Sequence, residues 1–90
     1  MLFAWIGFLK EGSEPDQEVQ QQVNSFLQQP YVPIQAAGAL RDGDRKRAGM
    51  MMLFEAADRA AAEALVADSP YLRAGLYERH DLYEYENEVG

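Results

Sequence analysis

Cysteine is absent from the 90 residues, which excludes disulfide bonds, thiol catalysis and cysteine-ligated metal sites. The chain has one histidine, and its scattered carboxylates show no ligand spacing, so we expect no metal site. There is also no glycine-rich phosphate loop and no nucleophile elbow. No sequence motif therefore points to a cofactor, and we expect none.

Basic residues are few. Eight Lys and Arg face 15 Asp and Glu, for a net charge of −7. Nucleic acid is a polyanion that is normally bound by a basic face, so we expect no nucleic-acid partner. Four of the eight basic residues lie together in the segment RDGDRKR at positions 41–47. Two interpretations of this segment remain open: a solvated hairpin tip, or an anion-attracting rim beside a pocket.

Long hydrophobic runs are absent as well. The apolar stretch LFAWIGFL at residues 2–9 is too short to span a membrane, and no basic residue precedes it as a signal peptide requires. We therefore expect no membrane partner and a cytoplasmic location. A chain of this length, with 48% hydrophobic residues, permits one folded domain over residues 1–90 with a single two-layer core.

Hydrophobic periodicity predicts four strands. The stretch 2–9 has strand length and apolar residues on both faces. Met51 to Phe54 are four consecutive apolar residues, which indicates a second strand buried on both faces. The predicted strands cover residues 2–9, 34–40, 49–56 and 75–86, and a turn at 70–75 leads into the last one.

Two helices are predicted between these strands. Ser13 is placed to cap the first helix, and Pro15 fits its first turn. Asp58 is placed to cap the second, alanine-rich helix, which ends before the segment Asp68-Ser69-Pro70. The apolar stripes are Val19, Val23, Phe26 and Leu27 on the first helix, and Ala61 and Leu65 on the second.

The order β-α-β-β-α-β predicts an α+β fold of the ferredoxin-like type, with a four-stranded antiparallel sheet and both helices on one face. The other face is apolar too: Ala4, Ile6 and Phe8 share it on the first strand. A bare patch of that size is unusual on a soluble monomer. We therefore expect a homodimer in which two sheets face each other, a dimeric α+β barrel that encloses a ligand cavity.

The last strand carries both charged and aromatic residues. Strict alternation places His80 and Leu82 on one face, with Tyr77 and Asp81 on the other. One interpretation is an edge strand whose charges block aggregation. The other is a polar wall beside a cavity.

The run from residue 37 to residue 85 resembles the YCII-related (YciI-like) family. Its most recognisable element is DSPYLRAGL, residues 68–76, which matches the family's Asp-Pro-aromatic and Ala-Gly pattern. The resemblance implies a ferredoxin-like fold and a dimeric barrel. It also implies an acid–base dyad formed by an aspartate, here Asp68, and a histidine on the first helix. The matching helical stretch has Val23 and Asn24 instead, and His80 does not occupy that motif position.

Two functional hypotheses follow. The first is a small-molecule enzyme, of lyase or isomerase type, that acts by proton transfer or elimination near Asp68. The second is a non-catalytic ligand-binding or accessory homodimer whose dyad is incomplete. In the first hypothesis the catalytic residues are Asp68 as base and His80 as helper, and the substrate-binding residues are Arg41 as anion clamp, Ser69, and the walls Tyr71 and Trp5.

Each of these residues also has a structural interpretation. Asp68 is placed to bond the backbone of the turn that follows its helix. His80 fits a strand histidine satisfied by a neighbouring side chain. Arg41 fits a solvated hairpin charge, and Tyr71 and Trp5 fit core residues.

Overall fold

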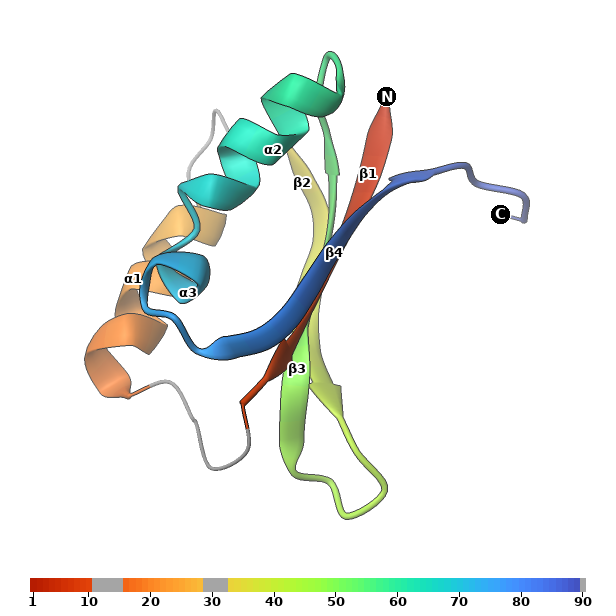
Figure 1. The fold of residues 1–90 in the computed structure, drawn as a ribbon. Coiled ribbons are helices and arrows are strands. Elements are labelled where there is room, and N and C mark those ends of the chain that lie inside the picture. Colours follow the sequence, from red (N-terminus) through yellow and green to blue (C-terminus); the bar gives the residue numbers. More distant parts are fainter. Residues whose placement is uncertain (11–15, 29–32, 90) are drawn as a thin grey trace.

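Strands and helices follow one another in the predicted order in a computed structural model of the chain (Figure 1). The structure describes residues 1–10, 16–28 and 33–89. One short helix is added to the predicted set, in place of the turn before the last strand. The elements are β1 (Leu2–Leu9), α1 (Gln17–Leu27), β2 (Ile34–Arg41), β3 (Arg47–Glu55), α2 (Arg59–Ala67), α3 (Pro70–Arg73) and β4 (Tyr77–Tyr85).

The four strands form one antiparallel sheet in the order β2-β3-β1-β4. All three helices lie on the same side of this sheet (Figure 1). The arrangement confirms the predicted ferredoxin-like fold. Within the described ranges, no helix is both long and apolar enough to cross a membrane.

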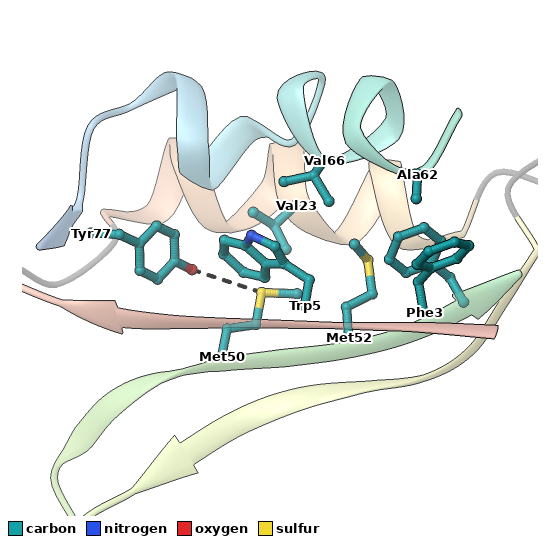
Figure 2. Close-up of a cluster of buried hydrophobic side chains, with 9 residues drawn as sticks. Phe3, Trp5, Val23, Met50, Met52, Ala62, Val66 and Tyr77 are labelled. Carbon is teal, nitrogen blue, oxygen red and sulfur yellow. Dashed lines mark hydrogen bonds between the residues drawn. The ribbon is translucent and has the colours of Figure 1, made fainter. Parts of the chain in front are cut away.

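The core lies between the sheet and the helices (Figure 2). Alternate residues of β1 and β3 point to this side because side chains of a strand alternate between its faces. Trp5, Met52 and Phe54 are at most 1% exposed. The other buried apolar residues of this cluster are Phe3, Val23, Met50, Ala62, Val66 and Tyr77.

The sheet face opposite the helices is only partly covered in the single chain. Ala4, Ile6 and Phe8 on β1 are half-buried, as are Met51 and Leu53 on β3. On this face Ala4, Ile6 and Phe8 pair with Leu53, Met51 and Gly49 of β3, respectively. Burial of both faces was predicted for β1 and β3, but within one chain the fully buried side chains of these two strands are those on the helix side.

Aspartates cap the N-termini of α1 and α2. The N-cap of α1 is Asp16, whose Oδ1 accepts the backbone N–H of Val19 at 2.8 Å. The predicted cap at Ser13 is therefore wrong, because the helix begins later, at Gln17; Ser13 and Pro15 lie outside the described residues. The predicted cap of α2 is confirmed, since Asp58 Oδ1 accepts the N–H of Ala61 at 2.8 Å.

Two predicted side-chain placements are shifted by one residue. On α2 the buried positions are Ala62 and Val66, not the predicted stripe of Ala61 and Leu65. On β4, Tyr77 is buried on the helix side, because the β1–β4 register shifts between Phe8 and Leu9. Strict alternation along β4 had placed this tyrosine on the other face.

Candidate functional site

A groove of about 610 Å³ lies on the helix side of the sheet, between α2, α3 and strand β4. We call it the β4 groove. It lies within one chain, on the face to which Trp5 points, and not on the open face where the sequence placed a ligand cavity. Its apolar and aromatic lining consists of Trp5, Val66, Ala67, Leu72, His80, Leu82 and Tyr83.

Trp5 and His80 meet in this groove. Their rings are 5.9 Å apart, and the indole Nε1–H donates to His80 Nδ1 at 3.4 Å, a long hydrogen bond. An indole nitrogen only donates, so the Nδ1 that accepts its hydrogen carries no proton. In a neutral imidazole this contact favours the tautomer that carries its proton on Nε2, the ring nitrogen that does not accept from the indole.

The indole is held rigidly from the other side. Trp5 is 1% exposed, and Tyr77 contacts it edge-on with ring centroids 5.1 Å apart. The Tyr77 hydroxyl lies 3.8 Å from Met50 Sδ (Figure 2). The indole that donates to the exposed His80 ring is thus anchored in the core.

A side-chain bridge joins α2 to the outer edge of β4. Arg59 donates through Nη2 to the carbonyl oxygen of Leu82 at 3.1 Å. Its Nε also pairs with Glu63 Oε1 at 3.1 Å. Arg59, Glu63 and Asp81 form the charged rim of the β4 groove. Arg59 was not predicted from the sequence, although a cation in the first turn of a helix is unusual because it opposes the helix dipole.

Asp68 is the C-cap residue of α2. Its backbone N–H lies 3.2 Å from the carbonyl oxygen of Leu65, and its side chain is exposed. It directly follows Ala67, which lines the β4 groove, but Asp68 itself is not part of the lining. Ser69 is 5% exposed and is the N-cap of α3 without a side-chain capping bond. The side chain of Tyr71 lies outside the described part of the structure.

The first helix supplies no titratable group at the position where the family resemblance implies a histidine. Val23 packs in the core at 2% exposure. Asn24 is exposed and accepts a hydrogen bond from Gln20 Nε2 at 3.1 Å. The histidine of this chain lies on β4 instead, across the groove from the end of α2.

Arg41 lies away from the β4 groove. It ends β2, which forms one edge of the sheet, whereas His80 lies on β4, which forms the opposite edge. Strands β3 and β1 separate the two residues. Of the residues singled out in the sequence, the structure therefore brings Trp5 and His80 together and leaves Arg41 apart. Asp68 and Ser69 follow the groove residue Ala67 in the chain but do not line the groove.

Solved structures with the same fold include several enzymes. The 5-chloro-2-hydroxyhydroquinone dehydrochlorinase TftG from Burkholderia phenoliruptrix AC1100, in complex with 2,5-dihydroxybenzoquinone, has a TM-score of 0.75 at 18% identity, over 98% of this chain and 96% of that one. An antibiotic biosynthesis monooxygenase has a TM-score of 0.57 at 17% identity, over 99% and 100% of the two chains. SnoaB, a cofactor-independent oxygenase from Streptomyces nogalater, has a TM-score of 0.53 at 16% identity, over 98% and 94%.

At these identities the likeness shows a shared fold. A search among curated proteins gave no match. The model of the YCII-related domain matches residues 1–86, which is nearly the whole sequence. The chain therefore belongs to the YCII-related family.

Proposed function

We propose that this protein is a small-molecule enzyme that carries out proton transfer or elimination in the β4 groove, next to Asp68. The hydrogen bond from Trp5 to His80 is the observation that carries the proposal. It leaves the imidazole Nε2–H as a donor in a groove whose wall is apolar. A fixed donor of this kind stabilises negative charge that develops on a substrate oxygen.

The roles divide between two residues. His80 donates through Nε2 to a carbonyl or hydroxyl oxygen of the substrate, and a carboxylate removes the proton. Asp68 is our choice for that base, since it follows Ala67 at the groove and the structure gives its side chain no hydrogen bond to a described residue. Glu63 and Asp81 on the charged rim are the competing bases.

The proposed substrate class is a small, flat, oxygenated ring. Leu72 and Leu82 offer apolar surface to such a ring, and His80 offers one polar contact. The likeness to a dehydrochlorinase solved with 2,5-dihydroxybenzoquinone supports this class. In a dehydrochlorination the base takes the proton and chloride leaves, so no external oxidant is needed.

Binding is tested with 2,5-dihydroxybenzoquinone. Trp5 is the only tryptophan, so its indole N–H gives one assignable NMR signal beside the site. We expect a saturable shift of this signal, which His80→Phe weakens and Arg73→Gln, on the exposed side of α3, leaves unchanged. A titration that moves no signal of Trp5, His80 or Leu82 contradicts the site.

Turnover is tested by chloride release from 5-chloro-2-hydroxyhydroquinone. We expect His80→Phe to lower kcat by about 100-fold, as loss of a fixed oxyanion donor does. Asp68→Asn is expected to lower kcat by about 100-fold or more, while Glu63→Gln and Asp81→Asn retain activity. If Asp68→Asn is fully active and Glu63→Gln or Asp81→Asn is inactive, Asp68 is not the base.

The second candidate function is a non-catalytic ligand-binding homodimer. It is favoured by the absence of a titratable group at Val23 and Asn24. The half-buried apolar face of Ile6, Phe8 and Met51 supports pairing with a second copy, since a two-fold pairing would cover the same patch on both chains. Saturable binding without any chloride release, in a protein that sediments as a dimer, is the result that selects this function.

A further inference from the structure

A second groove, of about 620 Å³, lies between the β2–β3 hairpin and helix α1. We call it the hairpin groove. Its lining includes Arg41, Arg45, Lys46, Arg47 and the glutamines of α1. We propose that the hairpin groove binds a small anion that carries at least two negative charges.

The charge of this groove contrasts with that of the whole chain. Four cations and a single carboxylate, Asp16, line it, whereas the chain has a net charge of −7. In the described part of the chain, no carboxylate lies within 4.0 Å of Arg41, Arg45 or Lys46. The Asp16 carboxylate is already engaged by the N–H of Val19. Three clustered cations that have no carboxylate partner among the described residues are available to an external anion.

The hairpin holds these cations in place. Asp42 Oδ1 accepts the N–H groups of Asp44 at 2.9 Å and of Lys46 at 3.0 Å. The Asp42 carboxylate therefore faces the backbone of its own loop. Arg41 Nη1 donates to the carbonyl oxygen of Arg45 at 3.0 Å, which spans the hairpin. An anion therefore meets a loop with a fixed shape, which reduces the entropy lost on binding.

Arg45 has a backbone conformation that its residue type does not favour. Its φ is 62°, and among the described residues it is the non-glycine residue with positive φ. Glycine adopts this conformation without strain, whereas a residue with a Cβ does not. A guanidinium is thus present where glycine would suit the turn better, which agrees with a role for the charge.

The opposite wall is built of neutral amides. Gln17, Gln20 and Gln21 line it, and Gln20 Oε1 accepts from Arg47 Nη1 at 3.2 Å. Amides donate and accept hydrogen bonds, so they suit the hydroxyl or carbonyl groups of a polar ligand. The ligand class is a polar small molecule with two or more oxyanion groups, either phosphates or carboxylates. This groove is separate from the β4 groove, so its test does not depend on the proposed function.

The probes are inorganic pyrophosphate and citrate, added to ¹⁵N-labelled full-length protein at constant ionic strength. We expect saturable shifts of backbone amides in residues 41–47 and 17–21. Saturation with pyrophosphate alone identifies a phosphorylated ligand, and saturation with citrate alone a polycarboxylate. Either result supports the proposal. Shifts that do not saturate, or that sodium chloride reproduces at equal ionic strength, overturn it.

Variants test the residues. Arg41→Gln and Arg45→Gly are each expected to weaken the affinity about tenfold, the usual effect of losing one charge-assisted contact. Arg45→Gly is also expected to leave the unfolding midpoint unchanged or higher, so weaker binding cannot be attributed to misfolding. Arg73→Gln is the matched control and should bind as the wild type does. Unchanged affinity in both Arg41→Gln and Arg45→Gly refutes the assignment.

Discussion

Gly7 provides the sharpest test of the Trp5–His80 contact. It lies on β1 opposite His80 in the strand register, next to the buried indole. A Cβ at this position would lie 2.5 Å from Trp5 Cη2 and 2.9 Å from Tyr77 Cδ1. Gly7→Ala therefore forces one of these two rings to move.

The size of the effect follows from how tightly the rings are packed. Trp5 is 1% exposed and Tyr77 is 8% exposed, so neither ring can move into solvent without opening the core. Inserting a methylene into a well-packed core costs about 1–3 kcal/mol. We expect the upper half of that range, because two aromatic rings meet the new methyl group. We also expect the indole to move away from His80.

The matched control is Gly38→Ala. Gly38 is also a strand glycine, but a Cβ there meets nothing within 4 Å. An added methyl should leave stability unchanged or raise it, by up to about 1 kcal/mol, since glycine is the costlier residue in a strand. Urea unfolding followed by circular dichroism gives both free energies, and the indole N–H signal reports the contact. Equal unfolding midpoints for the two variants, with an unmoved indole signal in Gly7→Ala, would refute the packing argument.

Three further substitutions test other parts of the structure. Asp58→Ala should cost about 1 kcal/mol in urea unfolding, because the Ala61 N–H loses its cap; no change in midpoint would show that this cap is not needed. Arg45→Gly should raise the free energy of unfolding by up to about 1 kcal/mol, since φ is 62°; a loss of stability would speak against strain at that residue. If two open sheet faces pair, Ile6→Glu should convert a dimer into a monomer with an unchanged circular dichroism spectrum, and equal sedimentation of both proteins would argue against that interface.

The fold could be predicted because periodicity and element order are local properties of the sequence. The alternation in LFAWIGFL separates Trp5 from Ile6. It does not show which of these two residues points toward the helices, because both sides of the strand are apolar. The position of the bulge between Phe8 and Leu9 depends on how two distant strands pair. That is why the burial of Tyr77 was not predicted.

The contact between Trp5 and His80 was not predicted, for a related reason. Trp5 and His80 are 75 positions apart, and the register of β1 against β4 brings them together. The separation of Arg41 from His80, by contrast, follows from the fold class itself. In a ferredoxin-like sheet the second and fourth strands are opposite edges. A single-chain site that uses both residues was therefore inconsistent with the fold that the same sequence predicts.

A homodimer is the arrangement in which Arg41 and His80 would share a site. If the two-fold axis of the dimer runs parallel to the strands, the β4 edge of each sheet lies beside the β2 edge of the other copy. If the two-fold axis runs perpendicular to the strands, each β4 edge lies beside the β4 edge of the other copy, and Arg41 and His80 stay apart.

Complementation distinguishes these two dimers for the proposed dehydrochlorinase activity. If Arg41→Gln and His80→Phe are each inactive, mixing them under exchange should restore part of the activity in the first case, because each mixed dimer keeps one intact site. A mixture that stays inactive excludes a shared site, and full activity of Arg41→Gln alone removes Arg41 from catalysis.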